Sequence, residues 1–177
     1  ADVARVLRTY EDQIEAGLDE TPNDEDIVFF MVDLDHFKSV NDTYGHACGD
    51  MVLIQMRDRL ARVFRESDYL IRWGGEEFLI LARDTNYEEA KDLAERIRHQ
   101  VDTHRFTLSD GEVIQRSCSI GFAPYPFFSE KAEFFAWEQV ISLADHCLYA
   151  AKGGGRNAWV GMRALVTPSE NSRSDTP

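Results

Sequence analysis

Two adjacent glutamates, Glu76 and Glu77, follow two glycines in the middle of an otherwise apolar stretch. Strand-forming residues lie on both sides, at 69–73 and 78–81, and Gly-Gly between such runs predicts a hairpin turn. Glycine also allows a ligand to approach the backbone closely. Two neighbouring carboxylates repel each other and add nothing to a core, so a metal ion or a reacting proton would explain them. Taken alone, the pair is more typical of a solvated turn.

A second acidic pair strengthens the chemical interpretation. Asp33 and Asp35 follow the unbroken apolar run 27–32, which predicts a buried strand. If this strand end and the hairpin converge, they could hold one divalent cation, and oxygen ligands with room for substrate phosphates suit Mg²⁺. We rank Asp35 below Asp33 as a metal ligand, since its carboxylate could instead bond neighbouring backbone or the region of Arg72.

Both acidic groups are part of longer motifs that extend over roughly residues 25–160. The motifs are Asp33-x-Asp35-x-Phe37-Lys38-x-x-Asn41-Asp42-x-x-Gly45-His46-x-x-Gly49-Asp50, Arg72-x-Gly74-Gly75-Glu76-Glu77-Phe78, Ser119-Ile120-Gly121, Ala144-Asp145-x-x-Leu148-Tyr149-x-Ala151-Lys152 and Gly155-Arg156-Asn157. In these residues the chain resembles the GGDEF-domain family, the bacterial diguanylate cyclases, and it carries the GGEEF variant of the family signature. The resemblance covers most of the chain and its motifs are highly specific.

The remaining sequence predicts an α+β fold, with a mostly antiparallel central sheet covered by helices. The resemblance implies a palm-like fold similar to that of class III nucleotide cyclases. Strand-like segments occupy 105–123 and 158–160. Apolar residues recur at helical spacing in 3–18, 47–64, 88–101 and 137–152.

The length of 177 residues and the hydrophobic content of 44% are sufficient for one domain with its own core. We expect residues 1–162 to form the GGDEF domain and residues 163–177, rich in Ser, Pro and Asp, to be a disordered tail. The family's Asp-x-Leu-Thr-Gly-Leu-x-Asn-Arg segment should precede the first strand and is absent from the sequence. This favours a piece of a longer protein, in which an upstream sensory or dimerisation domain comes first.

The formal net charge of −13 disfavours binding to DNA, RNA or anionic membranes, although a nucleotide needs only a few local cations and a metal ion. No apolar run approaches the length of a membrane span and no signal peptide is visible. We therefore expect a cytoplasmic domain, with a membrane anchor elsewhere in a longer protein left open. The cysteines, Cys48, Cys118 and Cys147, fit neither a zinc pattern nor a disulfide framework, so we expect reduced thiols.

Three other interpretations of these motifs fail. A calcium-binding EF-hand loop that begins at Asp33 would need an oxygen ligand and a glycine where Phe37 and Lys38 stand. A P-loop needs a Gly-Lys-Ser/Thr ending, which the glycines at 153–155 lack; alone, these glycines predict a helix end. His46 follows a glycine and is more typical of a turn than of a metal ligand.

The resemblance implies that two GTP molecules are condensed into cyclic di-GMP with release of pyrophosphate. The 3′-hydroxyl of one GTP attacks the α-phosphorus of the other, a displacement that needs charge neutralisation and in-line positioning. Carried over by motif, Asp33, Glu76 and the Leu34 carbonyl ligate Mg²⁺, which Mn²⁺ can replace, and metal binding lowers the pKa of the attacking hydroxyl. Glu77 is either the base or a ligand of a second metal ion.

The resemblance also assigns the substrate contacts. Asn41 and Asp50 match the family's guanine-reading pair. An Asp that accepts from guanine N1–H and N2–H₂ rejects adenine, which lacks both donors. Lys38, Lys152 and Arg156 match phosphate contacts, and their positive charges locally offset the acidic surface.

The resemblance implies one GTP per domain, so product formation needs a homodimer with two domains face to face. The sequence contains no coiled coil, so we expect the dimer to depend on an upstream part or on the ligand, and the isolated piece to be weakly active. The run Arg65-Glu66-Ser67-Asp68 resembles the family's Arg-x-x-Asp inhibitory site for cyclic di-GMP, and Arg96 matches its second arginine, offered by a neighbouring domain or subunit. Product bound there should inhibit without competing with GTP.

Two functions of other classes stay open at this point. The domain could be a catalytically silent receptor for GTP or cyclic di-GMP, as degenerate members of the family are. The intact Glu76–Glu77 pair and Asp33 argue against a receptor, because a cluster of acids is costly to maintain unless chemistry uses it. A plain interaction module would leave the acid-tipped hairpin unexplained.

Overall fold

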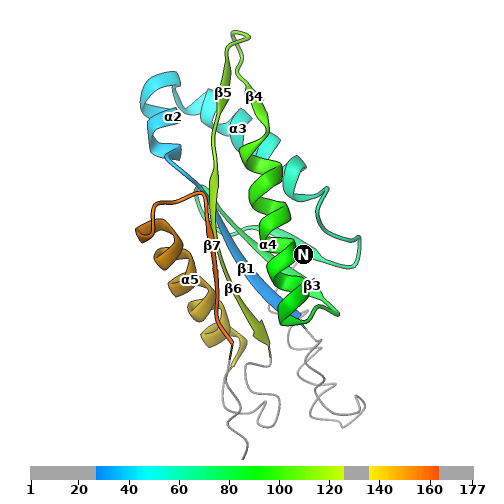
Figure 1. Cartoon of the computed structure of the whole chain (residues 1–177). Coiled ribbons are helices and arrows are strands. Elements are labelled where there is room, and N and C mark those ends of the chain that lie inside the picture. The colour runs from blue at the N-terminus through cyan, green and yellow to red at the C-terminus, as the bar shows by residue number, and fades with distance from the viewer. Residues whose placement is uncertain (1–26, 126–135, 164–177) are drawn as a thin grey trace, which may run out of the picture.

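The computed structural model describes residues 27–125 and 136–163, which form one sheet with helices on both faces and a small separate hairpin (Figure 1). The helix expected at 3–18, and all but the first residue of the tail expected at 163–177, lie outside the described residues. Within the two described ranges, no helix is long and apolar enough to cross a membrane.

A five-stranded sheet forms the centre of the fold, with the strand order β2-β3-β1-β6-β7. β1 pairs antiparallel with β3 on one side and with β6 on the other, whereas β7 runs parallel to β6. The mostly antiparallel sheet predicted from the sequence is therefore confirmed. The strands are β1 (Ile27–Leu34), β2 (Tyr69–Arg72), β3 (Glu77–Arg83), β6 (Cys118–Tyr125) and β7 (Trp159–Gly161).

Helices cover both faces of this sheet. α3 and α4 pack on one face, α5 packs on the other, and the β4–β5 hairpin extends past the sheet beside α2 and α3 (Figure 1). The helices expected at 88–101 and 137–152 correspond to α4 and α5. The bounds are α2 (Phe37–Tyr44), α3 (His46–Leu60), α4 (Tyr87–Asp102), α5 (Trp137–Gly153), β4 (Arg105–Thr107) and β5 (Val113–Gln115).

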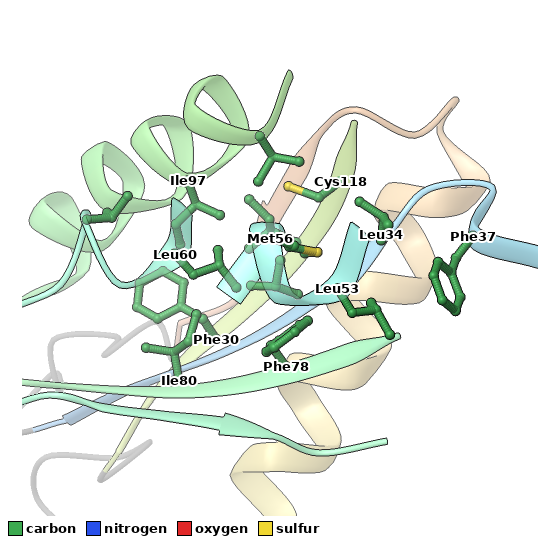
Figure 2. Close-up of a cluster of buried hydrophobic side chains, with 14 of the residues drawn as sticks. Phe30, Leu34, Phe37, Leu53, Met56, Leu60, Phe78, Ile80, Ile97 and Cys118 are labelled. Atoms are coloured by element: carbon green, nitrogen blue, oxygen red, sulfur yellow. The ribbon is translucent and has the colours of Figure 1, made fainter. Parts of the chain in front are cut away.

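The central strand β1 is buried on both faces, which accounts for its unbroken apolar sequence. Phe30 lies in the core formed with α3 and α4, and its neighbour Phe29 lies in a second core under α5. In the first core Leu60 of α3, Ile97 of α4 and Ile80 of β3 lie together with Phe30 (Figure 2). Because both cores are built on β1, the end of this strand has a fixed place in the fold.

The helix expected at 47–64 ends earlier, at Leu60, where α3 ends. Two backbone hydrogen bonds between residues three positions apart form a tight turn there. The Arg62 N–H donates to the Arg59 carbonyl at 3.2 Å, and the Val63 N–H donates to the Leu60 carbonyl at 2.9 Å. Val63 is buried all the same. Val63 therefore packs against the core from the turn that follows α3, and its apolar side chain does not indicate a longer helix.

Helix α5 approaches β6 closely at Gly121. A Cβ on this residue would lie 2.0 Å from the Ala144 carbonyl oxygen and 2.2 Å from the Leu148 nitrogen, both backbone atoms of α5. Only glycine therefore allows the helix to lie against the strand at this distance. The close approach fixes the position of the last turns of α5, which carry Lys152.

Candidate functional site

The register between β1 and β3 brings the two acidic motifs together. Asp33 of β1 lies opposite Glu77 of β3 in the antiparallel ladder, and the Leu34 N–H donates to the Glu76 carbonyl oxygen at 3.4 Å. Side chains of opposite residues in such a pair are close enough to interact directly. The convergence of the strand end and the hairpin, predicted from the sequence, is confirmed.

Hydrogen bonds hold the turn between β2 and β3 in one shape. The Arg72 guanidinium donates twice to the Gly75 carbonyl oxygen, from Nε at 3.2 Å and from Nη2 at 2.9 Å. The Trp73 N–H donates to the Glu77 carbonyl oxygen at 2.9 Å. A Cβ on Gly74 would lie 3.0 Å from a carboxylate oxygen of Glu77, so the glycine leaves room for that side chain. These contacts fix the two glutamates relative to the sheet.

Asp33 is the buried charge of the site, with 4% of its surface exposed. Lys152 of α5 forms an ion pair with it, in which Nζ lies 2.8 Å from Oδ2. Burial raises the pKa of Asp33 to about 6; the bond and charge of Lys152 oppose the rise, and the negative charges of Glu76 and Glu77 add to it. A buried carboxylate whose ionised form is disfavoured gains from further positive charge, such as a metal ion.

A pocket of about 240 Å³ is bordered by the Asp33 and Glu76 carboxylates and by three cationic side chains. Cationic side chains bind phosphate oxygens and carboxylates bind metal ions, so this lining suits a metal-bound polyphosphate. The full lining consists of Asp33, Leu34, Asp35, His36, Phe37, Lys38, Glu76, Lys152 and Arg156. The structure therefore brings together all three expected phosphate contacts and the expected metal ligands Asp33, Leu34 and Glu76. Glu77, the other expected ligand, is not part of this lining.

Asp35 borders this pocket, but its carboxylate is hydrogen-bonded to other residues of the chain. Its surface is 1% exposed, and its carboxylate accepts from the hydroxyls of Ser117 and Ser119, each at 2.7 Å, and from the Asn157 N–H at 3.0 Å. The expectation that Asp35 bonds backbone is confirmed at Asn157. The alternative contact, near Arg72, is not among these hydrogen bonds of Asp35, and Arg72 bonds the Gly75 carbonyl.

The two residues expected to read guanine lie where α2 meets α3. A Cβ on Gly49 would lie 2.0 Å from Asn41 Oδ1, so the glycine makes room for the amide. That oxygen is buried and has no hydrogen-bond partner among the described residues. Asp50 is exposed in the first turns of α3. A base with N–H donors can satisfy polar groups of this kind.

The oxygen donors at Asp33 are of the kind that Mg²⁺ uses. In the part of the chain that the structure describes, no three His, Cys, Asp or Glu side chains form a group that could hold a metal ion. Mg²⁺ does not require one, because it keeps several waters and usually binds through one or two carboxylates plus substrate phosphates. The carboxylates of Asp33 and Glu76 and the carbonyl of Leu34 fit this mode.

A second hollow, of about 480 Å³, lies between α4 and the turns that follow α3. Arg65, Asp68 and Arg96 all border it. The Asp68 carboxylate accepts from the backbone N–H groups of Arg65 at 2.8 Å and of Arg83 at 3.0 Å, which orders the turn. Arg96 therefore meets the Arg-x-x-Asp turn within one chain, whereas the sequence interpretation assigned it to a neighbouring domain or subunit.

Two features of the site were not foreseen from the sequence. Lys152 pairs directly with Asp33, although its motif indicated only a phosphate contact. Glu77 borders a separate hollow of about 440 Å³, together with Trp73 and Trp137, and does not share the lining of the 240 Å³ pocket. The sequence held no signal for this separation, because Glu77 and Asp33 are opposite residues of one antiparallel pair and lie on the same face of the sheet.

Comparisons with known proteins agree with this geometry. The family model described as "Diguanylate cyclase, GGDEF domain" matches residues 7–158. Diguanylate cyclase A of Treponema denticola is 38% identical over 133 residues, which cover 75% of this chain and 34% of that protein. The chain thus spans about a third of the length of this curated relative.

Solved structures show the same fold. The GGDEF domain of TpbB (YfiN) from Pseudomonas aeruginosa aligns with a TM-score of 0.75 and 31% identity, over 92% of this chain and 93% of that chain. The GGDEF domain of DgcB from Caulobacter crescentus, in complex with c-di-GMP, aligns with a TM-score of 0.73 and 29% identity, over 89% and 86%. The predicted α+β architecture is therefore confirmed.

We predict that Asp33→Asn stabilises the metal-free chain at high pH. The pKa of Asp33 in the folded chain, about 6, lies above its ordinary value of 3.8, so folding opposes its ionisation. The wild-type chain therefore loses about 3 kcal/mol of stability as the pH rises through this interval, and the neutral variant does not.

Urea unfolding of both chains in the presence of a chelator measures this difference. The free energies of unfolding should diverge in favour of Asp33→Asn near pH 8 relative to their difference near pH 4. A difference that is the same at both pH values would contradict a burial-raised pKa.

Proposed function

Because the chain belongs to the GGDEF family of diguanylate cyclases, we propose that its Asp33 site condenses GTP into cyclic di-GMP with release of pyrophosphate. The observation that carries the proposal is the buried Asp33 carboxylate, opposite Glu77 in the sheet and paired with Lys152 at a pocket bordered by cations. A structural acid has its oxygens bonded to the fold, as Asp35 has. Asp33 also pairs with one residue of the fold, Lys152, but that residue borders the same 240 Å³ pocket, where Lys38 and Arg156 add further positive charge.

The reaction is an in-line displacement at phosphorus. The 3′-hydroxyl oxygen of one GTP attacks the α-phosphorus of the other, the bond to the bridging oxygen of pyrophosphate breaks, and the hydroxyl proton passes to a base. The 3′-hydroxyl of the second GTP then attacks the α-phosphorus of the first. This second displacement closes the ring and releases a second pyrophosphate. Negative charge on the phosphoryl and leaving oxygens is stabilised by positioned cations. Lys38, Lys152 and Arg156 border the pocket and supply this charge.

The acids of the site divide into two roles in this proposal. Asp33, Glu76 and the Leu34 carbonyl would hold Mg²⁺, and Mn²⁺ can take its place. A divalent ion held by these residues would lower the pKa of the attacking hydroxyl and neutralise phosphate charge. Glu77 lies opposite Asp33 and borders the neighbouring hollow, so it either accepts the hydroxyl proton or binds a second ion.

Guanine selection is assigned to the junction of α2 and α3. The exposed Asp50 carboxylate can accept from guanine N1–H and N2–H₂, and adenine has neither donor. The buried Asn41 oxygen nearby has no partner among the described residues, so a bound base or its water can supply the missing hydrogen bond.

Product formation requires two chains in this proposal. The 240 Å³ pocket gathers one set of cationic side chains, Lys38, Lys152 and Arg156, so we assign one GTP to each chain. The second GTP must therefore come from a partner chain whose pocket faces the first, in a homodimer. An upstream sensory or dimerisation domain in a longer protein would hold the two domains together.

The 480 Å³ hollow is the candidate site for inhibition by product. Arg65 and Arg96 border it, and arginine forks bind phosphate oxygens and the guanine Hoogsteen edge. The relative DgcB has been crystallised in complex with c-di-GMP, which supports binding of this ligand by such domains. No lining residue is common to this hollow and the Asp33 pocket. Product bound there would therefore inhibit without competing directly with GTP.

A catalytically silent receptor for GTP or cyclic di-GMP is the second candidate, and one observation favours it. Lys152 forms an ion pair with Asp33, and this pair can stabilise the buried carboxylate without a metal ion. A receptor needs the cations and the hollow but not the acids. Turnover by the wild-type chain separates the two candidates.

We predict that Asp33→Ala and Glu76→Ala each slow synthesis by on the order of 100-fold or more, because each removes an oxygen ligand beside the reacting phosphate. The chain is incubated with GTP and Mg²⁺, and the nucleotides are separated by chromatography. Asp58→Ala removes an exposed acid that pairs with Arg57, and this control should keep the wild-type rate.

Near-normal rates in both site variants, with circular dichroism spectra that match the wild type, would refute the metal assignment. A wild-type chain that binds GTP but makes no product at any chain concentration would favour the receptor.

We predict that Arg65→Ala stays active and loses inhibition by cyclic di-GMP, because it removes a guanidinium from the 480 Å³ hollow and leaves the Asp33 pocket intact. Progress curves with added product should show that the variant needs roughly tenfold more product for half inhibition. Arg57→Ala removes an exposed arginine outside the hollow and should behave as wild type. Equal inhibition of the wild type and Arg65→Ala would place the inhibitory site elsewhere.

A further inference from the structure

The turn that follows α5 has an unusual backbone. Arg156 and Asn157 have φ angles of 65° and 46°, and the preceding Gly155 has a φ angle of 120°. Such left-handed conformations are uncommon for residues other than glycine, and arginine has no special tolerance of them. Two in succession persist only where surrounding contacts hold them in place.

Asn157 makes three such contacts. Its Oδ1 accepts from Arg98 Nη1 at 2.9 Å, and its Nδ2 donates to Asp102 Oδ1 at 3.2 Å. Its backbone N–H donates to Asp35 Oδ2 at 3.0 Å. Asparagine suits this position because one end of its amide accepts and the other donates, and because it tolerates the left-handed conformation. The turn is thus clamped between α4 and the residue that follows β1.

The partners of Asn157 are themselves held. Arg98 donates from Nη2 to Glu95 Oε1 at 2.6 Å and from Nε to Glu95 Oε2 at 3.0 Å, and only 22% of its side chain is exposed. Asp35 is buried and accepts from two serine hydroxyls besides the Asn157 N–H. The clamp therefore consists of groups with little freedom to move, and Asn157 is the residue that connects them to the turn.

Arg156 is the residue whose place depends on this clamp. It is exposed and borders the 240 Å³ pocket with Lys38 and Lys152, and its backbone N–H donates to the Ala151 carbonyl at 3.2 Å. The backbone angles at Arg156 and Asn157 set the direction in which the Arg156 side chain leaves the turn. A turn released from the clamp would relax to the usual φ region and point the guanidinium elsewhere.

We propose that Asn157 is a positioning residue for the triphosphate: it holds the left-handed turn so that the Arg156 guanidinium faces the phosphates in the Asp33 pocket. This inference rests on the proposed function, in which that pocket takes GTP. Asn157 itself touches no ligand; it acts through Arg156. Loss of its side chain should therefore weaken triphosphate binding and leave the contacts to the base unchanged.

A double-mutant cycle tests this dependence. Calorimetry with Mg²⁺ measures the binding of 3′-deoxy-GTP, which lacks the attacking hydroxyl and cannot react, to wild type, Arg156→Ala, Asn157→Ala and the double variant. Each single substitution should weaken binding by roughly tenfold, and the double variant should bind no more weakly than Arg156→Ala alone. GMP, which lacks the β- and γ-phosphates, should bind all four chains equally.

Two further variants guard against simple loss of folding. Asn157→Gly accepts a positive φ without strain yet lacks the amide, so it should fold and show the same weakening as Asn157→Ala. Asn157→Asp combined with Asp102→Asn exchanges donor and acceptor between the two positions and should restore affinity, whereas Asn157→Asp alone places two carboxylates together and should not. Thermal unfolding confirms that each chain is folded.

The outcomes separate this inference from the proposed function. If the wild type and Arg156→Ala differ in 3′-deoxy-GTP binding while Asn157→Gly binds as the wild type does, the positioning role is refuted and the pocket assignment stands. Independent, multiplicative losses in the double variant would refute it as well. If the wild type does not bind 3′-deoxy-GTP at all, the proposed function fails, and the inference fails with it.

Discussion

The pairing of β1 with β3 is the constraint on which the site depends. Its register sets Asp33 opposite Glu77 at the point where a strand buried on both faces ends. Burial disfavours the Asp33 charge and raises its pKa to about 6, and the Lys152 ion pair offsets only part of this effect. A slip of one residue in the register would send each β1 side chain to the opposite face. The packing that stabilises the sheet therefore also produces a carboxylate that favours a further cation.

Elements far apart in the chain hold the other sides of this carboxylate. Gly121 of β6 allows α5 to lie close enough for its last turns to present Lys152 to Asp33. Helix α4 contributes through Arg98, which bonds Asn157 in the turn after α5. The acids come from β1 and from the β2–β3 hairpin, and the cations come from the surrounding helices and turns. The site is thus a product of tertiary packing, since no single segment contains both groups in contact.

Local sequence patterns predicted most of the helices and strands. Features that depend on contacts between residues far apart in the chain could not be predicted in this way. The unbroken apolar run before Asp33 and the paired glycines before the two glutamates predicted the strand end and hairpin correctly, because these are local features. The end of α3 was placed too late, because Val63 is buried from a turn and mimics a helical position. The bonds of Asn157 could not be foreseen, since Arg98 and Asp35 lie 59 and 122 residues away in the chain.

We propose that Asp33 and the hairpin glutamates together hold a metal-bound nucleotide. Nuclear magnetic resonance of the isotope-labelled chain with Mn²⁺ and 3′-deoxy-GTP tests it most directly, because the paramagnetic ion broadens signals of nearby backbone amides. In the wild type the amides of Asp33, Leu34 and Glu76 should broaden first, and Asp33→Ala should abolish this selectivity. First broadening at a distant acidic patch, or unchanged broadening in Asp33→Ala, would contradict the account.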